Sequence, residues 1–443
     1  MRLTSNMFIL AVFLTGCANS KSISGLTPTA PNQQIASVPP ATVTRAAIST
    51  LSMTPAMTPL PSAAADKIIQ RNYAIIQADN AEYVNQIVRY HGFELEDNYW
   101  GLGQHHPGNN VVPDGMLAVA FSPNNYRILF GSSNGAGIWN LEHYLTQPLL
   151  EESRPVILVE KYTNDVAFSP DGNSYAFGHL LDTPQLQIIP TQTCACNTPE
   201  LGPDPVFAFA FNPDGDTMGI LPDLGIWDWH GTSVFPQRRI SLPPEYIPLP
   251  FDRYADTSIA FSPDGKIIAT GGVFYKGGIQ ASTVYQGIIV LWDSKTGRVI
   301  HIFDKDKSMK RVTSLSFNSE GDLLLSDGED GTVRLWNIEN NSLLAKLEGT
   351  NSTAPAVVFG PNGSIFAAGN QDGTIRIWDA KTYQLLRTIQ AHLGKTTGIS
   401  FSFDGRFIAS SGDDGTVGLW GVCAHGAAAN IISPDTQYPC TSP

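Results

Sequence analysis

The sequence is short of charge. Only 15% of its 443 residues are Asp, Glu, Lys or Arg, and the net charge at pH 7 is −13. A protein that binds the phosphate backbone of nucleic acids needs clustered Lys and Arg, and no such cluster stands out along this chain. We therefore expect no nucleic-acid binding.

Long hydrophobic runs are also missing. The apolar run at residues 7–14 is too short for a membrane-spanning helix, which needs about 20 residues, and with Arg2 before it the run indicates an export signal. It ends in "LTGC", residues 14–17, which resembles the lipobox of bacterial lipoproteins. That resemblance implies cleavage of residues 1–16 and acyl chains on Cys17. An ordinary signal peptide with a chance cysteine is the alternative.

A lipidated Cys17 would place the mature chain in a bacterial cell envelope, outside the cytoplasm. The anchor would sit on the outer face of the cytoplasmic membrane or in an outer membrane. Residues 17–65 then look like a tether. They are rich in Pro, Thr, Ser and Ala, and from residue 27 onward Arg45 is their only charge. Without a hydrophobic period they cannot build a core, so we expect a disordered linker.

Cysteine is scarce. The chain has five, so four remain when Cys17 is set aside, and four cysteines allow three pairings. We favour a disulfide between Cys423 and Cys440, which would fix the C-terminal tail, residues 426–443, to the last repeat. Cys194 and Cys196 form either a strained local bridge or two free thiols. One Cys-X-Cys pair with no second ligand pair nearby does not predict a metal site.

Catalytic motifs are absent as well. The sequence has no GxSxG, no HExxH, no P-loop and no GxGxxG in a strand–helix setting. His105 and His106 lie in a segment rich in Gly, Pro and Asn and are expected to be loop residues. The many Asp-Gly pairs are explained as turn formers. We expect no catalytic residues, no metal and no cofactor.

The sequence does contain a repeat. "EDGTVRLWN" at 329–337 recurs as "QDGTIRIWD" at 371–379 and "DDGTVGLWG" at 413–421. A Phe in a phrase like "AFSPDG" precedes each copy, and the whole chain has seven such phrases, at Phe121, Phe168, Phe211, Phe261, Phe317, Phe359 and Phe401. Their spacing of 42–56 residues, with short alternating strands and Asp-Gly or Asn-Gly turns, favours four-stranded sheets packed radially.

These motifs resemble the WD40 repeat family over roughly residues 84–423. The resemblance implies an all-β, seven-bladed propeller and is strongest in units five to seven; unit two has "LQIIP" at 186–190 in place of the Trp strand. In this family a tetrad of His, Ser or Thr, Asp and Trp is hydrogen-bonded through one blade. Only unit seven supplies all four residues, which are His392, Ser410, Asp414 and Trp420. Unit five has no His in place.

The ring also needs a strand from its other end. No obvious fourth strand follows Trp420, whereas residues 84–91 have the pattern of an extended strand. We expect them to complete the seventh sheet, within a propeller domain that spans residues 66–425.

Unit four is the longest. It inserts residues 273–286 between its second and third strands, and a long loop, residues 243–256, precedes it. Connections of both kinds emerge on one face of a propeller of this family. The aromatic and Arg side chains there are candidates for partner binding; they are Tyr246, Phe251, Arg253, Tyr254, Phe274, Tyr275 and Tyr285. The alternative is that they fold down over blade four and bury themselves.

The sequence thus predicts a non-catalytic interaction platform. The WD40 resemblance implies a ring, monomeric in our interpretation, that displays loops to a protein or peptide partner and attaches to a membrane through its N-terminal lipid. Two alternatives stay open. One is a hydrolase-like propeller enzyme, and the other is a sensor that binds a glycan or a small ligand.

Overall fold

The computed structural model describes the part of the chain that forms the repeats. The described residues are 73–74, 76–77, 81, 85–91, 115–124, 126–141, 155–159, 161–179, 186–191, 200–201, 206–221, 224–230, 233–240, 253–276, 284–347 and 356–423. They belong to Thr54–Pro443, the second of two compact units into which the chain divides. The expected signal peptide, linker and C-terminal tail lie outside the described residues.

The described residues form seven antiparallel sheets, numbered here as blades one to seven. Blade one contains β3 (Met116–Phe121), β4 (Arg127–Ser132), β5 (Ala136–Asn140) and β6 (Val156–Val159). Blade two contains β7 (Thr163–Phe168), β8 (Ser174–His179), β9 (Leu186–Pro190) and β10 (Glu200–Leu201), and blade three contains β11 (Phe209–Phe211), β12 (Thr217–Ile220), β13 (Gly225–His230) and β14 (Ser233–Arg239).

The C-terminal blades are the more regular half. Blade four contains β15 (Arg253–Phe261), β16 (Ile267–Lys276), β17 (Val284–Asp293) and β18 (Val299–Phe303). Blade five contains β19 (Val312–Phe317), β20 (Leu323–Gly328), β21 (Val333–Asn337) and β22 (Ser342–Leu347); blade six contains β23 (Ala356–Phe359), β24 (Ile365–Gly369), β25 (Thr374–Asp379) and β26 (Leu385–Gln390). Blade seven contains β27 (Thr396–Phe401), β28 (Phe407–Gly412) and β29 (Thr416–Cys423), and it is completed by β1 (Tyr73–Ala74) and β2 (Asn85–His91).

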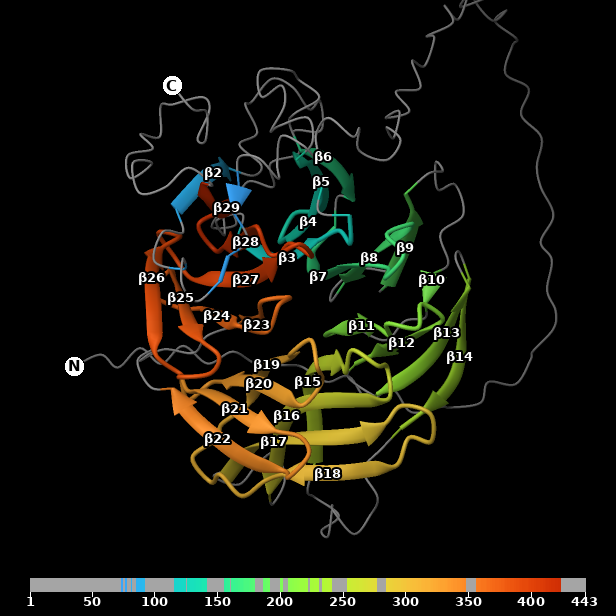
Figure 1. The fold of residues 1–443 in the computed structure, drawn as a ribbon. Coiled ribbons are helices and arrows are strands. Elements are labelled where there is room, and N and C mark those ends of the chain that lie inside the picture. The colour runs from blue at the N-terminus through green and yellow to red at the C-terminus, as the bar shows by residue number, and fades with distance from the viewer. Residues whose placement is uncertain are drawn as a thin grey trace, which may run out of the picture. The chain divides into compact units, whose positions relative to one another are not determined.

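The first strands of the blades form the inner wall of a ring (Figure 1). They contact one another in the order β3, β7, β11, β15, β19, β23 and β27, and β27 returns to contact β3. The prediction of an all-β, seven-bladed propeller is therefore confirmed. Each repeat supplies one blade, and a sheet that would expose an apolar face alone buries it against the next blade.

Hydrophobic clusters between neighbouring blades form the core. Leu325 and Leu335 of blade five, for example, share one cluster with Phe359, Phe366 and Trp378 of blade six. The second strand of a blade is sandwiched between two neighbours, so β24 with its sequence IFAAG is buried at every position. This explains why the second strands do not show the alternation of polar and apolar residues that marks a half-buried strand.

The "SPDG" phrases form the turns between first and second strands. In blade seven, Ser402 Oγ donates to Asp404 Oδ1 at 2.7 Å and accepts the N–H of Phe407 at 2.9 Å. Gly405 follows with φ of 71°, a conformation that costs most residues energy and glycine very little. The Asp of this phrase is occupied inside its own turn.

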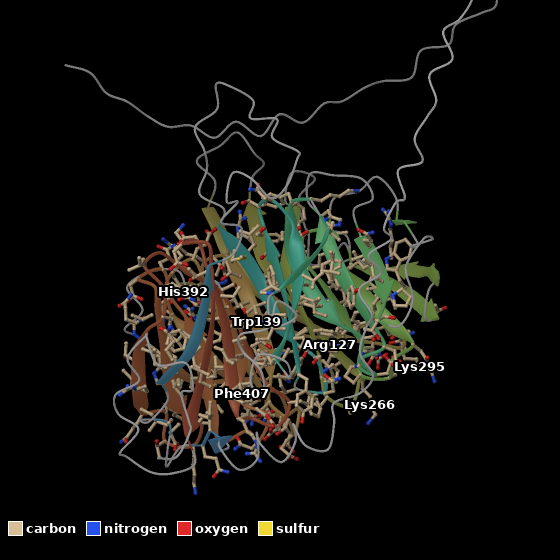
Figure 2. All side chains as sticks on the ribbon, turned by 90° about the horizontal axis from the view of Figure 1, so that it is seen from above. Arg127, Trp139, Lys266, Lys295, His392 and Phe407 are labelled. Carbon is tan, nitrogen blue, oxygen red and sulfur yellow. The ribbon has the colours of Figure 1, made fainter. Side chains whose placement is uncertain are left out.

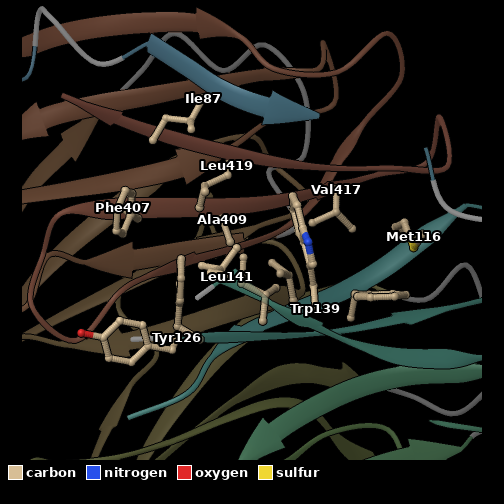
Figure 3. Close-up of a cluster of buried hydrophobic side chains, with 13 residues drawn as sticks. Ile87, Met116, Tyr126, Trp139, Leu141, Phe407, Ala409, Val417 and Leu419 are labelled. Atoms are coloured by element: carbon tan, nitrogen blue, oxygen red, sulfur yellow. The ribbon is translucent and has the colours of Figure 1, made fainter. Parts of the chain in front are cut away.

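The N-terminal strands close the ring. β2 pairs antiparallel with β29 from Asn85 opposite Gly421 to His91 opposite Thr416, and β1 continues along the same strand with Tyr73 opposite Cys423. Ile87 of β2 lies in the cluster between blades seven and one, with Trp139, Phe407 and Leu419 among its members (Figure 3). Residues 73–91, called the N-terminal arm below, supply the strand that the sequence predicts for residues 84–91.

Polar side chains on the inner strands join several neighbouring blades. Ser314 Oγ of blade five accepts the N–H of Val357 in blade six at 3.0 Å, and Ser400 Oγ of blade seven accepts the N–H of Phe121 in blade one at 3.2 Å. Between blades two and three a carboxylate takes this place, because Asp165 Oδ2 accepts the N–H of Phe209 at 2.9 Å. Burial raises the pKa of Asp165 to about 7, although backbone hydrogen bonds from Phe209 and Val166 oppose that shift.

The junction between blades two and three is expected to weaken as the pH rises from about 4 to about 7. The folded chain keeps a proton on Asp165 in this window, in which the unfolded chain, with an Asp pKa of 3.8, has lost it. The free energy of unfolding therefore falls as the pH rises through the window and levels off above it. The side chain in Asp165→Asn cannot titrate, so the unfolding free energy of this variant should fall less steeply with pH than that of the unaltered chain. The difference between the two slopes should reach about 1.4 kcal/mol per pH unit. Urea unfolding of both proteins across this range tests the prediction, which parallel curves would contradict.

Candidate functional site

Blade seven contains a continuous chain of hydrogen bonds among buried side chains. His392 is fully buried; its Nε2 lies 2.8 Å from Ser410 Oγ, and its Nδ1 lies 3.1 Å from Asp414 Oδ1. Ser410 Oγ accepts the indole N–H of Trp420 at 2.8 Å, so its own hydroxyl is free to donate to His392 Nε2. These are the four residues of the tetrad that the sequence singles out in unit seven, and Figure 2 shows His392 near one end of the blades.

Asp414 fixes the connection that leads into blade seven. Its Oδ2 accepts the backbone N–H of Leu393 at 2.8 Å. Burial by itself would raise the pKa of Asp414, but hydrogen bonds from His392, Thr416 and Leu393 outweigh it and hold that pKa well below its usual range. The carboxylate is therefore charged at neutral pH, and it holds the backbone of the connection at Leu393.

Blade five replaces the missing His with an ion network. Arg334 of β21 is 1% exposed, and its guanidinium donates through Nε to Asp306 Oδ2 at 2.7 Å and through Nη1 to Asp330 Oδ1 at 3.0 Å. Lys346 Nζ donates to Asp306 Oδ1 at 2.9 Å from the outer strand β22. The Trp336 indole still donates to Ser326 Oγ at 2.8 Å, as in blade seven. The sequence shows the missing His but not that Arg334 takes over its structural role.

Blade four differs from the prediction. Residues 273–286 are not simply an inserted loop, because β16 and β17 continue through much of this segment and pair from Val273 opposite Gly287 to Lys276 opposite Val284. β15 lengthens with them and pairs Arg253 with Tyr275. β16 has ten residues where β20 of blade five has six, so the blade extends about 13 Å further along the strand direction. We call residues 253–256, 273–276 and 284–287 the blade-four extension.

The structure brings most of the candidate binding residues into this extension. The sequence predicts loops for these residues, but the structure places five of them on the three strands of the extension: Arg253, Tyr254, Phe274, Tyr275 and Tyr285. Tyr275 stands between Arg253 and Tyr285 in the register, and Phe274 stands between Tyr254 and Gln286. Phe274 is partly buried and packs against the core of blades three and four, as the alternative interpretation expects for it. Tyr246 and Phe251 lie outside the described residues.

A lysine-rich connection, residues 304–311, lies beside the blade-four extension. Its sequence is "DKDKSMKR", and it runs from β18 of blade four to β19 of blade five. Gln286 Nε2 of β17 donates to the carbonyl of Asp304, and Gly287 N donates to the carbonyl of Met309 at 2.8 Å. The sequence alone does not reveal a basic surface here, because two Asp residues alternate with the lysines.

The remaining candidates lie at or beyond the ends of the described residues. Cys423 ends β29, whereas Cys440 and the expected lipidation site Cys17 lie outside the described residues. Among the described residues, no three His, Cys, Asp or Glu side chains are grouped so that they could hold a metal ion. Among the same residues, no helix has the length and apolar character needed to cross a membrane.

Comparison with known proteins identifies four repeats. Residues 257–293, 297–337, 341–379 and 383–421 each match the family model described as "WD domain, G-beta repeat". A WD repeat-containing protein of Arabidopsis thaliana, VIP3, is 30% identical over 112 residues, which is 23% of this chain and 32% of that protein. The match thus spans about a third of that relative's length. Each of the last three matched segments begins at or just before the outer strand of one blade and ends with the third strand of the next.

Proposed function

We propose that this chain is a non-catalytic protein-interaction platform, held at the outer face of a bacterial membrane by a lipid on Cys17. The chain has WD40 repeats and a seven-bladed propeller fold, and repeats of this type generally serve as scaffolds for other proteins. The observation that carries the proposal is the blade-four extension, in which three strands run beyond the length of their counterparts in blade five. A blade that is built out beyond its neighbours offers an additional surface on which a partner can dock.

The N-terminal arm joins the ring at the end of the strands opposite to the blade-four extension. β1 pairs with Tyr73 opposite Cys423 at the end of β29, and the next described residue, Ile76, donates its N–H to Gly405 in the turn between β27 and β28. The blade-four extension lies at the opposite end of the strands, where second strands end and third strands begin. Because one chain closes the ring with its own arm, we propose a monomer.

Partner capture tests the proposal with the full-length chain. The variant replaces residues 274–286 by Asn-Gly, which keeps the pair Val273–Gly287 and closes it with a two-residue hairpin turn. The full chain should capture a protein from the envelope fraction of its native cell, and the shortened chain should retain less than about a tenth of it. The matched control replaces only residues 277–283 and leaves the strands of the extension in place.

Each outcome of the capture experiment is informative. Loss with the shortened chain and retention with the control place the site on the extension. Capture of the same protein by all three chains moves the site elsewhere on the ring. If none of the folded chains captures a protein, the platform is contradicted. Labelling of the full chain with a fatty acid, and its loss in Cys17→Ser, tests the anchor separately.

A further inference from the structure

We propose that the lysine-rich connection, residues 304–311, binds an acidic, extended segment of the partner protein. The inference rests on the platform proposed above and names the chemistry of its partner. Three observations support it: hydrogen bonds of Asp306 and the buried Met309 hold the connection against the ring, its lysines are exposed without carboxylate partners in the described part of the chain, and it adjoins the blade-four extension.

Asp306 gives the connection its shape. Its Oδ1 accepts from the N–H of Ser308 at 3.1 Å and from the Ser308 hydroxyl at 2.7 Å, while Oδ2 accepts from the buried Arg334. Burial of Asp306 would raise its pKa, but hydrogen bonds from Ser308, Lys346 and Arg334 outweigh burial and hold the pKa well below its usual range. Met309, which is 2% exposed, anchors the same connection in the core. The carboxylate of Asp306 is therefore engaged in hydrogen bonds within the protein and is not available to balance the charge of the lysines.

The lysines are left with uncompensated charge. Lys305, Lys307 and Lys310 are all exposed. Within the described part of the chain none of the three pairs with a carboxylate, and Lys307 Nζ donates only to neutral oxygens, the Gln286 side chain at 3.2 Å and the Asp304 carbonyl at 3.0 Å. Because Asp306 faces inward, Asp304 is the one exposed acidic residue of the connection beside its three exposed lysines. This local excess of positive charge stands on a chain whose net charge is −13.

An acidic protein segment fits this surface better than a membrane does. The N-terminal arm enters blade seven at the other end of the strands, so the chain from the N-terminus does not join the ring at the end that carries the lysines. Lysine ammonium groups are flexible point charges, which suits several carboxylates spread along an extended segment. The bonds from Gln286 and Gly287 make the connection continuous with the blade-four extension, so one partner can contact both.

Charge reversal with a matched control tests the inference. The test variant is Lys305→Glu with Lys307→Glu and Lys310→Glu, and the control is Lys295→Glu with Arg298→Glu and Lys381→Glu. Both change the net charge equally, but the control residues are exposed in turns at the opposite end of the strands, where Figure 2 shows Lys295. The probe is a fluorescein-labelled peptide of alternating Glu and Ser, about a dozen residues long. Its binding to the full chains is measured by anisotropy, with circular dichroism to verify folding.

We expect the test variant to lose at least about tenfold in affinity and the control less than about twofold, with binding by the unaltered chain weakening as salt is raised. Equal losses in both variants, or no binding of the peptide by the unaltered chain, would overturn the inference. The inference would also be overturned if the unaltered chain bound phosphatidylglycerol vesicles more tightly than the peptide and the test variant lost this binding. A lipid headgroup would then be the ligand. If the test variant still captures the partner protein in the capture experiment described above, this inference is refuted, whereas the proposal of an interaction platform is not.

Discussion

A chain that begins at residue 92 is expected to lose the cooperative thermal unfolding of the full-length protein, whereas a chain that begins at residue 66 should keep it. The difference is the N-terminal arm. Without it β29 becomes a bare edge, and the core between blades seven and one loses Ile87, which is 7% exposed in the intact ring. The core between blades six and seven loses Ile76 and Ala81 as well.

The size of this effect follows from what the arm contributes. A whole strand with its backbone pairing and three buried apolar side chains is worth several kcal/mol, against a total stability of about 5–15 kcal/mol for a typical domain. The exposed edge of β29 would also favour aggregation. Calorimetry and sedimentation of both truncated chains check the prediction. Equal melting temperatures would show that the ring is held by its remaining blade interfaces alone.

Arg334→Ala is expected to destabilise the ring by about 3–5 kcal/mol, because it leaves two largely buried carboxylates, Asp330 and Asp306, without the guanidinium between them and leaves Asp306 with only the half-exposed Lys346 as a cation. Asp306 and Asp330 have 9% and 11% of their side-chain surface exposed, so water would compensate only part of the lost interaction with the guanidinium. Combining Arg334→Met with Asp306→Asn and Asp330→Asn removes all three charges and should recover most of the loss. Urea denaturation of the single and triple variants measures the difference. A triple variant as unstable as Arg334→Ala would show that the packing of Arg334, and not its charge, supports blade five.

The network also has a pH signature of opposite sign to that of Asp165. The pKa of Asp306 is lowered in the folded chain, so its contribution to stability is present above the pKa of an unfolded Asp and is lost as the pH falls. Acid should therefore weaken blade five while it strengthens the junction between blades two and three.

Much of the ring can be predicted from sequence because it repeats. The spacing of the Phe and Trp residues gives seven blades, and the tetrad residues of unit seven lie within hydrogen-bonding distance in the structure. Sequence fails at the departures from the repeat. The extra residues of unit four contain Gly277 and Gly278 and resemble a loop, but β-branched and aromatic residues at both ends allow the strands to continue to Lys276 and from Val284.

The lysine-rich connection cannot be predicted from the sequence for a different reason. Alternation of Asp and Lys along residues 304–307 looks neutral when charges are counted in order. Only the fold shows that Asp306 turns toward Arg334, a residue 28 positions away, and thereby leaves the neighbouring lysines without a counter-charge. A signal was present in the sequence, since unit five has Arg334 in place of the Gly418 of unit seven and lacks the tetrad His.

The way the ring closes also determines how the molecule bears load. If the chain before β1 is pulled away from the ring along the strand axes, the force acts on the pairs of β1 and β2 with β29. Backbone hydrogen bonds of an antiparallel pair lie perpendicular to the strands, so such a pull shears the pairs from Asn85 to His91 together instead of peeling them one by one. The two pairs of β1 with β29 would break first, while the longer pairing of β2 with β29 keeps the ring closed under tension.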